Sequence, residues 1–103
     1  MPHCIISCAA ALKFREDEML KQAFAAMSAS ELFVPERIMT RIHYFDALQT
    51  GGKNTPHSYI QVRLLAGRTA AQKQKLAQLL QQAFEPFGGK ASVEIIDLAE
   101  YYY

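Results

Sequence analysis

Four short segments of the chain have the apolar pattern of β-strands. In Ser58–Leu65, apolar residues occupy every second position, which is the period of a strand with one buried face. In Pro2–Cys8, the apolar residues run consecutively, which predicts a strand buried on both faces. The predicted strands are Pro2–Cys8, Ile38–Phe45, Ser58–Leu65 and Val93–Leu98.

Two longer segments between these strands have the apolar spacing of amphipathic helices. The first opens with acidic residues at 16–18, which favour the positive end of a helix dipole, and residues 28–30 end its apolar pattern. The second opens with Thr69 and Gln72 at the spacing of a capping box, and Pro86 ends it. The predicted buried faces are Leu20, Ala23, Phe24 and Met27 in the first helix, and Leu76, Leu79, Leu80, Ala83 and Phe84 in the second.

The two halves of the chain have the same pattern. A shift of 56 residues places Pro2 on Ser58 and aligns both the first strand and the first helix of each half. We therefore predict one domain over residues 1–103, built from two pseudo-repeat halves, 1–50 and 57–103, that a turn-forming segment at Thr50–Pro56 separates. The fold class is α+β, a β-α-β-β-α-β chain forming a four-stranded sheet.

Right-handed crossovers place both helices on one face of such a sheet. The strands nevertheless contain apolar residues on both sides, so the second face needs a covering layer. Another copy of the chain is the simplest source of that layer, and the pattern predicts an oligomer.

Composition excludes several classes of function. The 11 basic and 10 acidic residues form no basic stripe, so we expect no nucleic-acid partner. No apolar run approaches the roughly 18 residues of a membrane span, and the start of the chain lacks a secretory signal, so we expect a cytoplasmic protein. The histidines match no zinc template, and we expect no metal and no cofactor. Cys4 and Cys8 lie about 13 Å apart on an extended strand, too far to form a disulfide with each other.

Pro2 follows the initiator methionine directly. If Met1 is removed, Pro2 becomes a secondary amine at the head of a strand. An α-amino group titrates near pH 8, and cationic neighbours lower that pKa toward the value of an effective general base at neutral pH, about 7. The alternative is a proline that only begins a strand, an ordinary position for proline.

Three stretches resemble the tautomerase superfamily, whose members carry an amino-terminal catalytic proline. They are Pro2–Cys8, Ser58–Leu80 with its Gly67-Arg68-Thr69 turn, and Phe33–His43. The third stretch is similar to the double-length branch that contains 5-carboxymethyl-2-hydroxymuconate isomerase. The resemblance implies a homotrimer with sheets facing inward and active sites between subunits.

The resemblance also implies roles for individual residues. Pro2 corresponds to the catalytic proline, Arg68 to the arginine that binds a substrate carboxylate, and Arg41 to a second strand arginine. Lys13 lies where the branch often has a cation. An earlier strand arginine is Met39 in this chain, which favours a smaller or less charged acid than hydroxymuconate. The implied activity is cofactor-independent keto–enol tautomerisation or double-bond isomerisation of a small enol or keto carboxylic acid.

Two other functions remain open at this point. One is a tautomerase-like trimer that binds a small acid or a protein partner without turnover. The other is a ferredoxin-like dimeric barrel, which gives Pro2 no role. The terminal run of tyrosines at 101–103 suits packing at an interface better than the wall of a pocket, although aromatic rings with a polar tip fit either place.

Overall fold

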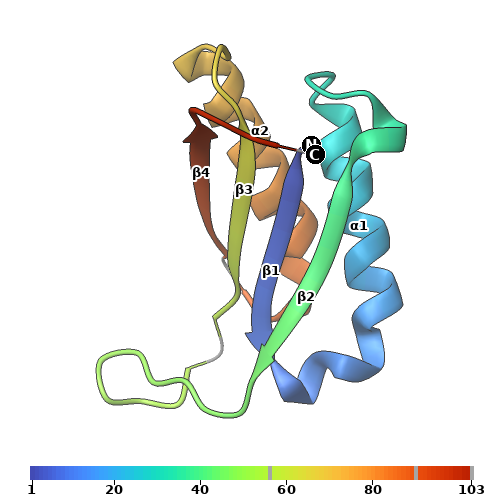
Figure 1. Cartoon of the computed structure of the whole chain (residues 1–103). Coiled ribbons are helices and arrows are strands. Elements are labelled where there is room, and N and C mark those ends of the chain that lie inside the picture. The colour runs from blue at the N-terminus through green and yellow to red at the C-terminus, as the bar shows by residue number, and fades with distance from the viewer. Residues whose placement is uncertain (56, 90, 103) are drawn as a thin grey trace.

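The computed structural model describes residues 1–55, 57–89 and 91–102 (Figure 1). The predicted order β-α-β-β-α-β is confirmed. Pro56, at the end of the predicted central turn, and Tyr103, in the terminal tyrosine run, lie outside the described residues. The strands and helices are β1 (His3–Ala9), α1 (Glu16–Ala29), β2 (Met39–Phe45), β3 (Tyr59–Leu65), α2 (Ala70–Phe84) and β4 (Ser92–Leu98). Short 3-10 helices are η1 (Ala10–Arg15), η2 (Pro35–Arg37) and η3 (Glu85–Phe87).

The four strands form one sheet in the order β2-β1-β3-β4. β1 pairs with β2 and β3 pairs with β4 in parallel, and the two halves join through an antiparallel pairing of β1 with β3 (Figure 1). Each helix therefore connects two strands that are direct neighbours. A ferredoxin-like split β-α-β unit has another strand between them, so that alternative is wrong.

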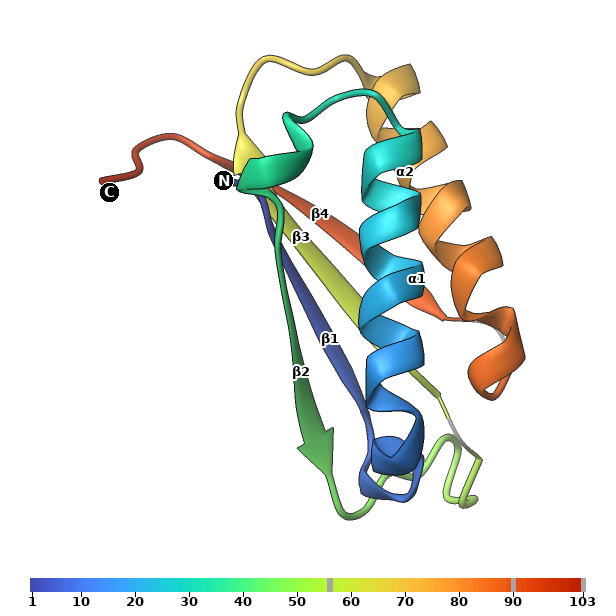
Figure 2. The same cartoon turned by 90° about the vertical axis from the view of Figure 1, so that its right-hand side faces the viewer.

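Both helices pack on the same face of the sheet, as the crossover rule predicts (Figure 2). The side chains on this face of the central strands are fully buried and meet a buried stripe from each helix. The central part of the core is Cys4, Ile6 and Cys8 from β1, Ile60, Val62 and Leu64 from β3, Met19, Ala23 and Met27 from α1, and Leu76, Leu80 and Phe84 from α2. No helix in the described residues is long and apolar enough to cross a bilayer.

The predicted buried face of α1 is partly wrong. Phe24 is 42% exposed, and Met19 and Ala26 are buried in its place. The buried helix residues match their counterparts under a shift of 57, whereas the strands match under 56. The reason is that η1 spans Ala10–Arg15, whereas only residues 66–69 connect β3 to α2, so the strand register does not fix the helix register.

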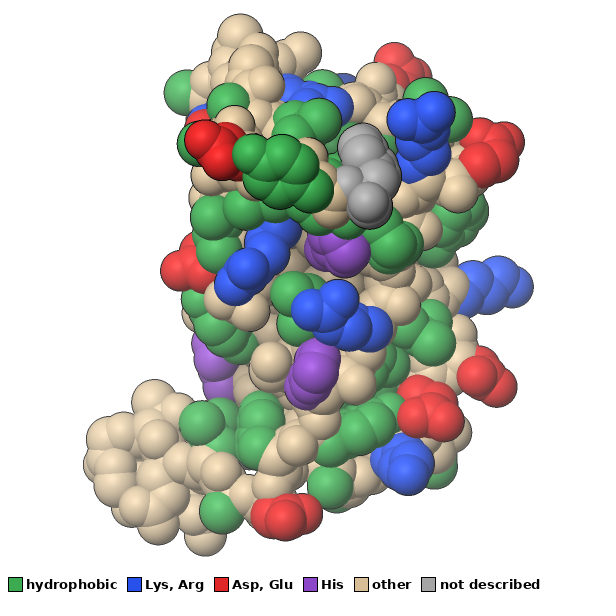
Figure 3. Space-filling model, in the orientation of Figure 1, with side chains coloured by type: hydrophobic (Ala, Val, Ile, Leu, Met, Phe, Trp, Pro, Cys, Tyr) green, Lys and Arg blue, Asp and Glu red, His purple; other side chains and the backbone are tan. Residues whose placement is uncertain are grey.

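No helix among the described residues covers the other face of the sheet. Figure 3 looks onto this face and shows basic and histidine side chains gathered on it, with apolar side chains around them. The expectation of an apolar surface is therefore only partly right. Met39 and Leu65 are apolar and exposed here, but Arg41 and Arg63 are exposed on the same face.

Candidate active site

Pro2 is fully buried at the start of β1, where its carbonyl oxygen accepts a hydrogen bond from the backbone N–H of Met39 at 3.0 Å. The antiparallel pairing of β1 with β3 brings the end of β3, and the turn that follows it, next to this position. A cavity of about 40 Å³ lies there. Its lining residues are Met1, Pro2, Phe33, Leu64, Leu65 and Arg68.

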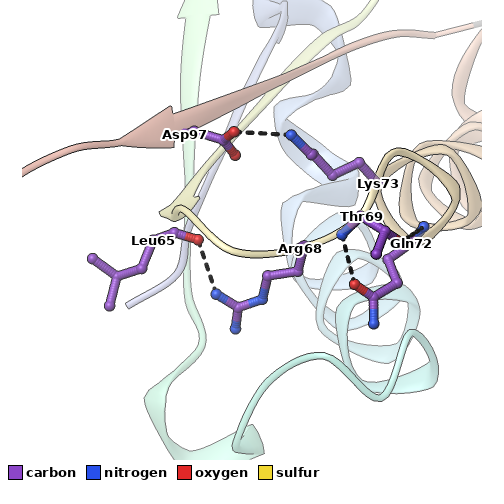
Figure 4. Close-up of polar contacts among 6 residues, drawn as sticks. All are labelled: Leu65, Arg68, Thr69, Gln72, Lys73 and Asp97. Atoms are coloured by element: carbon purple, nitrogen blue, oxygen red, sulfur yellow. Dashed lines mark hydrogen bonds and ion pairs between the residues drawn. The ribbon is translucent and has the colours of Figure 1, made fainter.

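The turn before α2 holds Arg68 in this cavity wall. Gly67 has a φ of 127°, a conformation that glycine adopts readily. Thr69 and Gln72 form both hydrogen bonds of the predicted capping box, which fixes the start of the helix (Figure 4). The sequence Gly-Arg-Thr therefore fixes the backbone position from which the side chain of Arg68 extends.

Two backbone carbonyls orient the guanidinium of Arg68. Its Nη1 donates to the carbonyl of Leu65 at 3.0 Å, and its Nη2 donates to the carbonyl of Leu32 at 2.9 Å (the Leu65 contact is drawn in Figure 4). The guanidinium carbon also lies 5.2 Å from the ring centroid of Phe33. Because a guanidinium has five N–H donors, these two bonds position it and leave donors for an anion.

Met1 covers Pro2. It lines the small cavity and also a larger one of about 530 Å³, whose other lining residues are Glu36, Arg37 and Met39. The amino group of Met1 donates to the carbonyl of Arg37 at 3.4 Å. Met1 thus lines both cavities, and loss of this residue would free the prolyl nitrogen.

Within one chain, the structure brings together Pro2 and Arg68 but not the other two predicted site residues. Arg41 is exposed on the uncovered face, where its Nε donates to Nε2 of His43 at 3.1 Å. Lys13 lies in η1, with its ammonium 5.9 Å from the ring centroid of Tyr44. Because η1 follows the far end of β1, Lys13 is roughly 20 Å or more from Pro2 at the rise of a strand. A role for either residue at Pro2 needs another subunit.

Sequence reasoning missed His3 and Arg63, which are cross-strand partners on the uncovered face. Burial lowers the pKa of His3, and the amino terminus, Arg41 and Arg63 lower it further. The alternation of β3 already assigns Arg63 to the face opposite Val62. Only the pairing of β1 with β3 shows that Arg63 lies beside His3, which follows Pro2.

The cysteines offer no competing nucleophile. Cys4 and Cys8 are both free and completely buried on the helix side of β1. Burial raises the pKa of the Cys4 thiol to about 12 and also raises that of Cys8. Among the described residues, no group of three or more His, Cys, Asp or Glu side chains could hold a metal ion.

Compared by sequence, the chain matches no family model and no curated protein. Compared by structure, it resembles a fused 4-OT solved as an asymmetric trimer, with a TM-score of 0.88 and 20% identity over 98% of this chain and 91% of that chain. The chain has the tautomerase-like fold. It also resembles the macrophage migration inhibitory factor of Toxoplasma gondii, with a TM-score of 0.83 and 22% identity over 98% of this chain and 95% of that chain.

A third similar structure is Pt0534 inactivated by 2-oxo-3-pentynoate, with a TM-score of 0.85 and 19% identity over 93% of this chain and 85% of that chain. At these identities, the likeness establishes the fold. The chemistry has to be argued from the residues of the site.

Proposed function

We propose that this protein is a cytoplasmic, cofactor-independent keto–enol tautomerase or double-bond isomerase, and that Pro2 is its general base once Met1 is removed. One observation carries the proposal: Pro2 and Arg68, from opposite halves of the chain, line the same cavity. A weak base and a guanidinium side by side are what proton transfer within a carboxylic acid needs.

The residues around Pro2 support this chemistry. The free prolyl amine takes a proton from a carbon or hydroxyl of the substrate and returns it at another position. Arg68 binds the carboxylate and stabilises the negative charge that develops as the enolate forms. Phe33, Leu64 and Leu65 supply an apolar wall, which strengthens these charge interactions and keeps the amine unprotonated.

The substrate class is argued from the side chains that line the Pro2 cavity itself, among which Arg68 is the cation. Arg68 provides one carboxylate site, and Met39 offers an apolar side chain in the wall of the larger cavity. We therefore propose a small enol or 2-keto acid with one carboxylate, rather than a substrate as charged as 5-carboxymethyl-2-hydroxymuconate. The role of Arg41 as a second carboxylate ligand is a proposal for an assembled site that combines subunits.

A homotrimer is part of the proposal. Two of the similar structures, both fused 4-OT forms, are trimers, one asymmetric and one symmetric. In this chain, Met39 and Leu65 expose apolar surface on the uncovered sheet face at the end where Pro2 lies. Contact between subunits there would cover this surface and complete the walls of the site.

The decisive experiment uses 2-oxo-3-pentynoate, an electrophilic alkynyl keto acid that inactivates Pt0534. Protein from which Met1 has been removed should gain the mass of one inhibitor molecule per chain, on the peptide that begins at Pro2, and should lose phenylpyruvate tautomerase activity measured by ultraviolet absorbance. Protein with Met1 retained under an amino-terminal tag should neither react nor turn over, because its prolyl nitrogen is an amide. A Cys4→Ser, Cys8→Ser variant is the control for thiol addition. Equal rates from tagged and untagged protein would refute a role for Pro2.

A second function fits two specific observations. Arg68 already donates to two backbone carbonyls, and Met1 covers Pro2. Both are compatible with a tautomerase-like trimer that binds a small acid or a protein partner without turnover. The intact mass of the purified protein separates the two functions, because retention of Met1 is compatible only with binding.

A further inference from the structure

The uncovered face of the sheet holds a group of basic side chains that the proposed reaction does not use as a unit. We define the cationic cluster as His3 of β1, Arg41 and His43 of β2, and Arg63 of β3. β1 lies between the other two strands, so the cluster crosses the sheet. Figure 3 shows these kinds of side chain gathered over the middle of this face.

The strand register makes the two arginines flank β1. Arg41 lies opposite Ile5, and Arg63 lies opposite His3. Their Cα atoms are therefore about 12 Å apart, from two strand spacings across the sheet and two residues along it. Ile5 is only 7% exposed although no described helix covers this face, so the side chains of its neighbours cover it. Each arginine lies one strand spacing from β1, and its side chain is long enough for both guanidiniums to reach one ligand placed over that strand.

The arginines of the cluster have little ionic pairing with the rest of the described residues. Neither Arg41 nor Arg63 forms an ion pair with any described residue. The acid that interacts with Arg63 is Glu94, but hydrogen bonds from Gln61 and Tyr59 are the larger causes of its lowered pKa. Glu94 is thus held by two neutral donors and forms no ion pair with Arg63 among the described residues.

His3 also lies among cationic groups. Among the described residues, the groups that face it are the amino terminus, Arg41 on β2, Arg63 on β3 and Tyr101 of the terminal segment, whose hydroxyl oxygen lies 2.9 Å from its Nε2. Burial is the largest cause of the lowered pKa of His3, and the amino terminus, Arg41 and Arg63 lower it further. An anion at this position would offset the repulsion.

We propose that the cationic cluster binds a polyvalent oxyanion of the phosphate class. The two guanidiniums supply planar N–H pairs that match its oxygens, and His3 lies on β1, the strand between theirs. One chain is sufficient for this site. In the proposed trimer, inward-facing sheets would bring three clusters together, and the anion would then hold subunits of like charge in contact.

Inorganic phosphate and sulfate are the probes, compared with chloride at matched ionic strength. We expect the melting temperature to rise with phosphate concentration as mass action requires for a ligand of the native state. Arg63→Gln should weaken phosphate affinity by about 10-fold or more, since it removes charge-assisted hydrogen bonds. Lys75→Gln is the matched control, because Lys75 is exposed on α2 in the other layer of the molecule. Histidine NMR titration should show that phosphate raises the pKa of His3.

Three outcomes would overturn the proposal. The first is equal stabilisation by phosphate and chloride. The second is equal affinity in Arg63→Gln, Lys75→Gln and the unmodified protein, which would indicate an adventitious ion only. The third is loss of phosphate binding in Arg68→Gln but not in Arg63→Gln, which would place the anion in the Pro2 cavity. Protein that retains Met1 should still bind phosphate, so failure of the proposed catalytic function leaves this test intact.

Discussion

At the scale of single residues, the two halves of the chain are equivalent in backbone but not in chemistry. The carbonyl of Pro2 accepts the N–H of Met39 at 3.0 Å, and the carbonyl of Ser58 accepts the N–H of Ser92 at the same distance. Ser58 is internal, so its nitrogen can never become a free amine. The pseudo-repeat therefore provides two strands that begin in the same way, and only the residue at the first of these positions, Pro2, can provide an amine base.

Arg68 tests whether charge alone is enough at the proposed site. Arg68→Lys keeps a cation in the cavity wall but loses the planar fork that two carbonyls orient. We expect kcat/KM for a 2-keto acid to fall roughly 10- to 100-fold, the range for one charge-assisted hydrogen bond. Steady-state kinetics measure the change, and thermal melting checks that the fold is intact. The same kcat/KM in both proteins would contradict a direct contact with the carboxylate.

Tyr44 makes stability depend on pH in the alkaline range. Burial, together with a hydrogen bond of 2.6 Å from its hydroxyl to Glu16, raises its pKa from 10.0 to about 12. A raised pKa means that folding favours the neutral phenol, so this stabilisation is complete below pH 10 and is lost as the pH rises through about 12. Urea unfolding of Tyr44→Phe should show a smaller loss of stability over this range, whereas Tyr102→Phe, with Tyr102 84% exposed, should behave like the unmodified protein.

At the scale of elements, local patterns predicted the strands well because a period of two leaves only one choice of face. Ile60, Val62 and Leu64 are all buried, as their alternation required. The register of α1 was less determined, because its apolar residues are spread around the helix and η1 sets its rotation. Tertiary packing buries Met19 and leaves Phe24 partly exposed.

That difference gives a matched pair of core substitutions. Leu80 is completely buried and Phe24 is 42% exposed, although the apolar pattern assigned both to the core. Leu80→Ala should lower the free energy of unfolding by about 2–5 kcal/mol, the cost of a cavity. Phe24→Ala should cost roughly 1 kcal/mol or less, because little area is lost from the core. Urea denaturation of both variants measures the difference, and equal losses would contradict the register of α1.

Contacts between the halves were harder to predict than the elements. The resemblance of Gly67-Arg68-Thr69 to the tautomerase turn implied that Arg68 binds a carboxylate, but nothing in the local sequence indicated that Phe33 would lie near the guanidinium. The position of Arg63 beside His3 depends on the pairing of β1 with β3, which joins residues far apart in the sequence. Candidate residues can be found from motifs, whereas their grouping into one site depends on the sheet topology.

At the scale of the whole molecule, the uncovered face combines two tendencies. Apolar side chains such as Met39 and Leu65 favour contact with another copy of the chain, and the cationic cluster opposes it. Assembly should therefore be specific, since only an arrangement that joins the apolar parts and separates or neutralises the cations is stable. This balance also makes the anion proposal and the trimer proposal experimentally separable.

The trimer itself can be tested with two equally exposed apolar residues. Leu65 is 40% exposed on the sheet face, and Phe24 is 42% exposed on the helix side. Sedimentation should give about three chain masses for the unmodified protein, where one chain is 11.6 kDa. Leu65→Glu should shift the protein toward monomer, because it places a charge in the proposed contact, and Phe24→Glu should not. A stable monomer of the unmodified protein, or equal dissociation of both variants, would remove the sheet face as the subunit contact. Because Leu65 also lines the Pro2 cavity, dissociation should coincide with slower labelling by 2-oxo-3-pentynoate.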